Sequence, residues 1–239
     1  GLTFEQAVTE AHRCLDCKNP TCVKGCPVNI NIPGFIKQLE LGNVLASAEI
    51  IQQSSTLPAV CGRVCPQEKQ CEAQCIHLKM GHEPVAIGYL ERFVADSAYK
   101  LSHSNLLLEK INNVPLRRKI AVVGSGPAGL AFAGDMAKYG YDVVVFEALH
   151  EIGGVLKYGI PEFRLPNSVV DREIEGLRRL GVQFQCDTII GKTLTINDLQ
   201  ADGFIGIFVG SGAGLPRFMG IPGENLNGVL SCNEYLTRV

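Results

Sequence analysis

The sequence lacks the features that would direct it to a membrane, a nucleic acid or the secretory route. No apolar run approaches the roughly 20 residues that a membrane-spanning helix needs, and no signal-peptide pattern opens the chain. Lys and Arg total 22 against 24 Asp and Glu, so a formal net charge of −2 leaves no basic surface for nucleic acid or anionic lipid. We therefore expect a cytoplasmic protein that binds neither membrane nor nucleic acid.

Repeats, low-complexity tracts and an initiator methionine are also missing, and the first residue is a glycine, which indicates a trimmed N-terminus. The 239 residues predict one to two domains, and a 46% hydrophobic share is enough for a real core. Eight of the ten cysteines fall within residues 14–75. We therefore predict a cysteine-rich domain over residues 1–112 and a second domain over residues 113–239, joined by a linker at residues 111–118 that contains Pro115.

The clearest local pattern is a short apolar run followed by glycines. Residues 120–123 form a β-branched run too short for a helix, which favours a buried parallel strand. In G-x-G-x-x-G spacing, the first glycine allows a tight turn, the second admits a pyrophosphate, and the third packs the next helix on the strand. The dinucleotide phosphates would lie at that helix's N-terminus. The residues predicted to bind them are Gly124, Gly126, Pro127, Ala128 and Gly129.

A second apolar strand over residues 143–146 ends at Glu147, which is placed to accept hydrogen bonds from a ribose. An acid at this position repels a 2′-phosphate, so the pattern favours FAD or NAD over NADP. Glycines also mark ordinary turns, but the strand, helix and acid around this motif favour a nucleotide site. A helix from Asn167 or Ser168 to Arg179 and strands over residues 182–186 and 204–209 extend the fold.

The eight clustered cysteines form two closely spaced groups, each containing a Cys-Pro step, which is typical of four-iron four-sulfur binding. Two zinc sites would also use eight thiolates, but zinc usually takes paired C-x2-C knuckles, and only one such pair occurs. Beside a nucleotide site, iron-sulfur clusters are the favoured interpretation. The groups are Cys14-x2-Cys17-x4-Cys22-x3-Cys26-Pro27 and Cys61-x3-Cys65-Pro66-x4-Cys71-x3-Cys75.

The cysteine-rich half is predicted to be helical with short loops. Thr3 and Gln6 fit a capping box for a helix toward Arg13. Further helices are expected to open at Pro33 and Asn43, to span residues 68–76, and to run from Pro84 to Ala98. Helices this small bury little surface, so we expect the clusters to hold them together.

Residues 151–166, EIGGVLKYGIPEFRLP, resemble the FAD domain of the pyridine nucleotide-disulfide reductase class. That resemblance implies flavin contacts at Gly154 and Leu156. Arg164 would contact the flavin, a neighbouring cluster or a substrate, or would form an ordinary salt bridge. The Gly210-Ser211-Gly212 segment resembles the second contact with the FAD phosphates, at Gly212.

The whole chain resembles the family of the NADPH-dependent glutamate synthase small subunit. The motifs, in order, are the two cysteine groups, GRVCP, AIGYLERF, GSGPAG, GIPEFRLP and GIPGENLNGV. The module is also similar to the large subunit of the electron-bifurcating NADH-dependent ferredoxin:NADP oxidoreductase, a sulfide dehydrogenase subunit, and the N-terminal part of dihydropyrimidine dehydrogenase. The implied fold is α plus α/β, with a small all-helical two-cluster domain before a truncated Rossmann-like FAD domain.

This resemblance implies interleaved cluster ligands, a pattern also found in two-cluster ferredoxins. One cluster would take Cys14, Cys17, Cys22 and Cys75, and the other Cys26, Cys65, Cys71 and Glu91. On a helix over residues 84–98, Glu91 would lie in an apolar stripe, where a carboxylate is costly unless it is paired or metal-bound. The alternatives are a salt bridge to Arg92 or a distant Lys, an exposed helix edge, or Cys61 as the fourth ligand. His12 and His77 are expected to be surface or core imidazoles rather than ligands. Cys186, on a predicted strand, and Cys232, at a predicted helix start, are expected to be small packing residues rather than ligands.

The implied function is electron transfer between NAD(P)H, FAD and two clusters to a larger partner subunit, with no catalytic acid or base. NADPH would bind a second Rossmann domain, and because the sequence contains no second G-x-G-x-x-G, we expect a fragment without that domain. Two alternatives from other classes are a non-catalytic electron-transfer module and a zinc-binding domain attached to a flavoprotein.

Overall fold

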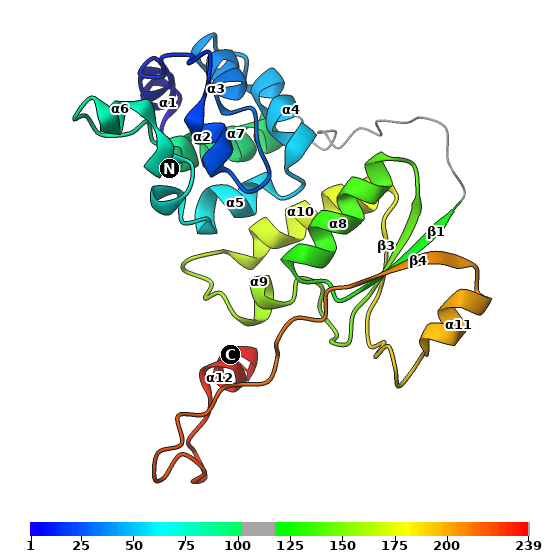
Figure 1. Cartoon of the computed structure of the whole chain (residues 1–239). Coiled ribbons are helices and arrows are strands. Elements are labelled where there is room, and N and C mark those ends of the chain that lie inside the picture. The colour runs from blue at the N-terminus through cyan, green and yellow to red at the C-terminus, as the bar shows by residue number, and fades with distance from the viewer. Residues whose placement is uncertain (102–117, 239) are drawn as a thin grey trace. The chain divides into compact units, whose positions relative to one another are not determined.

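A computed structural model describes residues 1–101 and 118–238, which form two units, Gly1–Glu109 and Lys110–Val239 (Figure 1). The predicted linker and the predicted boundary at residues 112 and 113 lie outside the described residues, apart from Arg118. A cysteine-rich helical unit followed by a parallel-sheet unit confirms the predicted fold class.

The first unit, here the helical unit, is built from short helices around one apolar core. Its centre is formed by fully buried side chains of Phe35, Leu39, Ile51, Leu90 and Val94, and Cys71 and Cys75 belong to the same core. The elements are α1 (Phe4–Ala11), α2 (Thr21–Gly25), α3 (Ile32–Glu40), α4 (Val44–Ser54), α5 (Pro58–Val64), η1 (Gln67–Lys69), η2 (Glu72–Gln74), α6 (Ile76–Lys79) and α7 (Ile87–Leu101).

The start of the helical unit follows its local signals. The predicted capping box is present, because the Thr3 side chain accepts from the Gln6 N–H and the Gln6 side chain accepts from the Thr3 N–H. Asn31 caps α3 through the Gly34 N–H, with Pro33 in the first turn. Asn43 stands at the N-terminus of α4, as predicted, although its side chain donates to Gln38 rather than capping the helix.

The later part of the helical unit corrects two predictions. Residues 68–76 are not one helix but two 3-10 turns, and the backbone is extended at Cys75, where α6 begins. The long helix α7 starts at Ile87 rather than Pro84. Helices α2, α5 and α6 were not predicted, although Pro58 in the first turn of α5 is a start signal.

The second unit, here the nucleotide unit, is a four-stranded parallel sheet in the order β3-β2-β1-β4. Helices α8 and α10 pack on each other, with α8 against β1 and β2, while α11 packs on β4 (Figure 1). The strands are β1 (Lys119–Val123), β2 (Asp142–Phe146), β3 (Gln183–Gln185) and β4 (Phe204–Val209), and the helices are α8 (Pro127–Lys138), α9 (Val155–Tyr158), α10 (Asn167–Leu180), α11 (Ile196–Ala201) and α12 (Cys232–Arg238).

The sheet register determines where the nucleotide unit can bind a ligand. Val123 at the end of β1 pairs with Phe146 of β2 and with Val209 of β4. The chain leaves β4 beside the glycine-rich turn that follows β1, since a Cβ on Gly124 would lie 2.5 Å from the Gly210 carbonyl oxygen. From β1 the chain continues through α8 to β2 at one edge of β1, whereas β4 pairs with the other edge of β1. This strand order places a switch point between β1 and β4, where open α/β sheets bind ligands.

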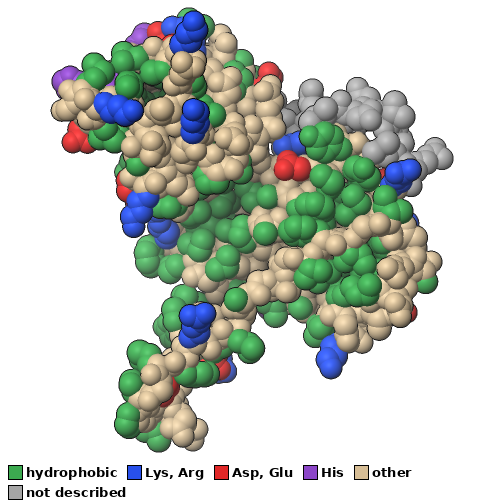
Figure 2. Space-filling model, viewed as in Figure 1, with side chains coloured by type: hydrophobic (Ala, Val, Ile, Leu, Met, Phe, Trp, Pro, Cys, Tyr) green, Lys and Arg blue, Asp and Glu red, His purple; other side chains and the backbone are tan. Residues whose placement is uncertain are grey.

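The segment after β4 carries several exposed apolar side chains. Leu215 is 90% exposed and Met219 is 77% exposed, and Figure 2 shows hydrophobic side chains along this extension toward α12. Elsewhere the described nucleotide unit has an ordinary core of Val122, Leu130 and Leu177. Within residues 1–101 and 118–238, no helix has the length and apolar character needed to cross a membrane.

Candidate cluster and nucleotide sites

Four cysteine side chains from both sequence groups line one pocket of the helical unit. Cys14, Cys17 and Cys22 come from the first group, and Cys75 comes from the second. The walls of this first thiol pocket are mostly apolar and include Ile32, Pro33, Ile36, Val85 and Ile87. The four residues that the resemblance assigns to one cluster are therefore neighbours, although ligand binding by them stays a prediction.

Contacts between α2 and η2 bring Cys75 to the first group. Thr21 at the start of α2 donates its hydroxyl to the carbonyl of Gln74, the residue before Cys75. A Cβ added at Gly25 would lie 2.6 Å from the carbonyl oxygen of Gln70, so only glycine permits this approach. The packing of these two short elements therefore places Cys75 beside the cysteines of the first group.

Burial raises the pKa of two thiols in the first thiol pocket. Burial is the largest cause that raises the pKa of Cys22 to about 11, and charges on Cys14, Cys75 and Cys17 raise it further. Burial likewise raises the pKa of Cys14, with Cys17, Asp16 and Cys75 adding to the shift. Four thiolates could share this pocket only if a bound metal centre compensated their charge.

The remaining candidate ligands form a second group around α5 and α7. Burial raises the pKa of Cys71 to about 12, followed by the charges of Glu72, Glu91 and Cys26. A hydrogen bond with Cys65, then burial and the charge of Glu91, raise the pKa of Cys61, while that bond lowers the pKa of Cys65 to about 7. Glu91 is therefore a neighbour of both Cys61 and Cys71, with Cys26 near Cys71 and Cys65 hydrogen-bonded to Cys61.

Glu91 lies on the inner face of α7, as the apolar stripe predicts. Its side chain is 6% exposed, with Ile87, Val94 and Ala98 buried one turn and two turns away and Ala95 partly buried. Ligation by this carboxylate is not decided by burial, and it stays a prediction.

Helix α5 carries Cys61 and reaches Cys65 at its end, and it crosses α7 at very short range. A Cβ on Gly62 would lie 2.6 Å from the Arg92 backbone nitrogen, so glycine is required at the crossing. Arg63 donates to both carboxylate oxygens of Asp96 on α7, at 2.9 and 2.7 Å. The Arg92 guanidinium also faces Asp96, at 3.9 Å. The close packing of α5 on α7 thus holds Cys61 and Cys65 beside the turn of α7 that contains Glu91.

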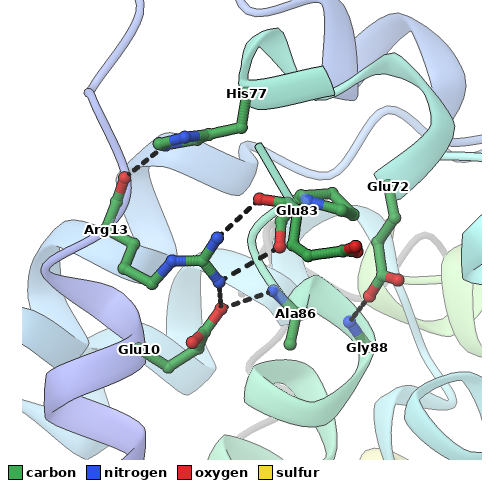
Figure 3. A network of polar contacts seen from close by, with 8 residues as sticks. Glu10, Arg13, Glu72, His77, Glu83, Ala86 and Gly88 are labelled. Atoms are coloured by element: carbon green, nitrogen blue, oxygen red, sulfur yellow. Dashed lines mark hydrogen bonds and ion pairs between the residues drawn. The ribbon is translucent and has the colours of Figure 1, made fainter. Parts of the chain in front are cut away.

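A polar network connects the segments that carry Cys14 and Cys75, two cysteines of the first thiol pocket (Figure 3). Arg13, one residue before Cys14, donates to Glu10 and to the carbonyls of Glu83 and Pro84. Glu10 also accepts from the Ala86 N–H, and the His77 ring contacts the Arg13 carbonyl at 2.7 Å. The chain before α7 is therefore held in a loop, which explains why α7 begins after Pro84. No sequence pattern signalled this network.

A four-iron cluster and a single zinc ion place different demands on their thiol ligands. Among residues 1–101 and 118–238, no group of three or more His, Cys, Asp and Glu side chains is placed to hold a metal ion. A zinc ion draws four sulfurs to about 2.3 Å from one centre, whereas each thiolate of a four-iron cluster binds a different iron.

The other cysteines and histidines lie mostly as expected. His12 is exposed and faces Glu40 at 3.2 Å, and His77 contacts backbone. Cys186 follows β3 rather than lying on it and is partly buried. Cys232 begins α12 as predicted, but it is exposed, so the prediction that it is a packing residue was wrong for the described chain.

In the glycine-rich turn of the nucleotide unit, a side chain would clash at the first and third glycines but would have room at the second. A Cβ on Gly124 would lie 2.5 Å from the Gly210 carbonyl oxygen, and one on Gly129 would lie 2.0 Å from that of Gly124. Gly124 also has a φ of +96°. A Cβ on Gly126 would meet nothing within 4 Å. The space over Gly126, beside Pro127 at the start of α8, therefore fits the pyrophosphate that the motif predicts.

Glu147 ends β2 as predicted, but its carboxylate already organises the turn. One oxygen accepts from both the N–H and the hydroxyl of Ser125, and the other accepts from the Leu149 N–H at 3.0 Å. The Ser125 hydroxyl also accepts from the Gly153 N–H at 2.9 Å. A ribose would use the remaining lone pairs of Glu147. Fully buried Ser125, which links both glycine turns, was not recognised in the sequence.

The other predicted flavin contacts differ in exposure. Gly154 has a φ of +53°, and a Cβ on it would lie 2.8 Å from the Gly126 Cα, so the second glycine turn packs on the first. Leu156 is buried in α9. Arg164 and Gly212 are exposed, and Gly212 has a φ of +71°. Flavin binding by these four residues stays a prediction.

Comparison with known families divides the chain as the structure does. Residues 1–103 match the model of dihydropyrimidine dehydrogenase domain II, 4Fe-4S cluster. Residues 122–180 match the model of an NAD(P)-binding Rossmann-like domain.

Curated relatives span both units. The small chain of NADPH glutamate synthase from Halomonas elongata is 37% identical over 97% of this chain and 48% of its own length. The subunit PreT of NAD-dependent dihydropyrimidine dehydrogenase from Escherichia coli K12 is 37% identical over 91% of this chain and 52% of its own. The putative oxidoreductase UacF of the same organism is 37% identical over 99% of this chain and 36% of its own length. The chain thus spans about half the length, or less, of these relatives.

Proposed function

We infer that this chain, as a member of the family of glutamate synthase small chains and dihydropyrimidine dehydrogenase-like proteins, works as an electron-transfer module. In this proposal, electrons pass between NAD(P)H, FAD and two four-iron four-sulfur clusters, and then to a larger partner subunit. The protein's own tasks are to bind these groups, shield them from water and set their potentials.

The observation that carries the proposal is the first thiol pocket. Its four cysteines come from two distant sequence groups, yet all four line one apolar recess. We assign one cluster to Cys14, Cys17, Cys22 and Cys75, and the other to Cys26, Cys65, Cys71 and Glu91. The match of residues 1–103 to a 4Fe-4S domain supports the assignment.

FAD is the nucleotide that we propose for the second unit. The open space over Gly126 suits a pyrophosphate, and the acid at Glu147 disfavours a 2′-phosphate. Gly154 presses the second glycine turn onto the first and would help to enclose the cofactor. We also assign Leu156, Arg164 and Gly212 to this site. When bound, a flavin exchanges two electrons with a nicotinamide and single electrons with clusters. NADPH itself would bind a second Rossmann domain, in the part of such proteins that this chain does not span.

The terminal acceptor is open between two kinds of partner. The relative named as a glutamate synthase small chain and the relative named as a dihydropyrimidine dehydrogenase subunit are both 37% identical to this chain. We propose a larger catalytic subunit of the glutamate synthase type as the partner, with a dihydropyrimidine dehydrogenase partner as the second candidate because of that equal similarity.

A count of iron, sulfide and flavin tests the proposal. The protein purified without oxygen should contain about eight irons and eight acid-labile sulfides, as two four-iron clusters require, and one FAD. A Cys75→Ser variant should lose about half of the iron and keep the flavin. A colourless protein with zinc in place of iron would contradict the electron-transfer role and favour a structural zinc domain.

A further inference from the structure

Cys61 is the one cysteine of the helical unit that neither proposed cluster uses. It lies on α5, four residues before Cys65, so the two side chains lie on the same face of the helix, one turn apart. Their sulfur atoms are hydrogen-bond partners. Cys61 therefore contacts a proposed ligand of the second cluster directly.

The contact argues against Cys61 as a fourth ligand. Ligands of one four-iron cluster bind different irons and are separated by the cluster between them. Two sulfurs that share a hydrogen bond are too close together for that arrangement. Glu91, whose charge acts on both Cys61 and Cys71, comes from another helix and can face the cluster from a different side.

The direction of the hydrogen bond follows from the proposed ligation. A sulfur bound to iron has lost its proton, so Cys65 can only accept. Cys61 must then be the donor, through its S–H group. Donation to a ligand sulfur stabilises the negative charge that a cluster gains on reduction, and hydrogen bonds to the sulfurs are among the factors that set cluster potentials.

A second residue supports the donor. Ser55, just after α4 and only 4% exposed, donates its hydroxyl to the Cys61 sulfur at 3.9 Å. The hydrogen bond from Ser55 to the Cys61 sulfur polarises the S–H bond of Cys61. The polarised S–H group is then a stronger hydrogen-bond donor to the Cys65 sulfur. The three residues form a relay that runs from Ser55 through Cys61 to Cys65.

We propose that this relay is a positioning and tuning device that raises the reduction potential of the second cluster, without Cys61 binding iron. The inference rests on the proposed function, because it requires a cluster bound by Cys65. It assigns to Cys61 and Ser55 a role that neither ligand set includes.

Potentiometric titration of the anaerobically purified protein, followed by electron paramagnetic resonance, tests the relay. In Cys61→Ala, one of the two cluster potentials should become more negative. The equilibrium constant for its reduction should fall by up to about tenfold, which corresponds to about 59 mV for one electron. The other potential and the iron content should not change. Ser55→Ala should shift the same cluster in the same direction by less, and Cys61→Ser, which keeps a donor, should restore most of the potential.

The matched control is Cys186→Ala, which removes a partly buried thiol from the nucleotide unit and should move neither potential. If Cys61→Ala loses about four irons, Cys61 is a ligand and the relay is overturned. Unchanged potentials in both Cys61→Ala and Ser55→Ala overturn it as well. A wild-type protein without clusters would instead overturn the proposed function, so the two failures can be told apart.

Discussion

The interleaving of the two cysteine groups makes a quantitative prediction about iron content. If Cys14 and Cys75 serve one cluster, a serine at either position removes that cluster, and serines at both positions remove nothing more. If Cys71 serves the other cluster, serines at both Cys71 and Cys75 remove both. The test therefore compares two double variants that differ in one position.

The expected magnitudes follow from four irons per cluster. Each single variant should lose about four of about eight irons. The Cys14→Ser, Cys75→Ser pair should still lose about four, whereas the Cys71→Ser, Cys75→Ser pair should lose about eight. One quartet per sequence group would give the opposite result, with about eight lost from the first pair and about four from the second.

The assay is a colorimetric count of iron and acid-labile sulfide on protein purified without oxygen, with circular dichroism to check folding. Cys71 and Cys75 are both buried in the helical core, so their variants carry similar packing costs and control for each other. Complete loss of iron from any single variant would mean that the unit unfolds. The sulfide count of Cys14→Ser, which changes a less buried residue, would then be the measurement that decides between interleaved ligands and one quartet per sequence group. Iron loss in the opposite order would refute the geometric grouping.

Three further perturbations test other parts of the molecule. Gly126→Ala should leave folding unchanged but weaken FAD binding at least about tenfold in a flavin titration. Gly129→Ala should instead lower the free energy of unfolding in urea by about 1 to 3 kcal/mol or more, because its Cβ meets a backbone carbonyl. If the two variants changed stability and FAD binding equally, the space over Gly126 would not be a ligand site. Arg63→Met should destabilise the protein by about 1 to 3 kcal/mol in the same assay, because it removes the two hydrogen bonds that Arg63 donates to the partly exposed carboxylate of Asp96. A loss below about 0.5 kcal/mol would argue against a stabilising role for this crossing. Glu91→Ala should change the potential and spectrum of one cluster, and an unchanged cluster would exclude ligation by that carboxylate.

The nucleotide unit could be predicted closely because its signals are local. Strand β4 runs over residues 204–209, as its apolar pattern predicts, and Gly181 ends α10 with a φ of +104°. Short apolar runs that end at glycine leave few alternatives. Ser125 could not be predicted, because its role depends on Glu147 and Gly153, more than 20 residues away.

The helical unit was harder to predict because its contacts are distant in sequence. Pro84 reads locally as a helix start, but Arg13 binds the carbonyls of residues 83 and 84 from 70 positions away and delays the helix to Ile87. Residues 68–76 have helical composition, yet the turns around Cys71 and Cys75 place both sulfurs in the core. Their cluster grouping came from family resemblance, since spacing alone also allows one quartet per group.

The two units position their cofactors by different physics. In the nucleotide unit, the cradle is backbone held by a sheet: Gly124 and Gly129 are packed tightly, and Gly126 is open before any ligand binds. In the helical unit, the candidate ligands are cysteine side chains, and burial raises the pKa of Cys22 to about 11 and that of Cys71 to about 12. A cluster bound by these two thiols would have to displace their protons, so in the proposed function the bound iron would supply the charge compensation. We therefore expect the helical unit to depend on its clusters for stability, and the nucleotide unit to fold without its flavin.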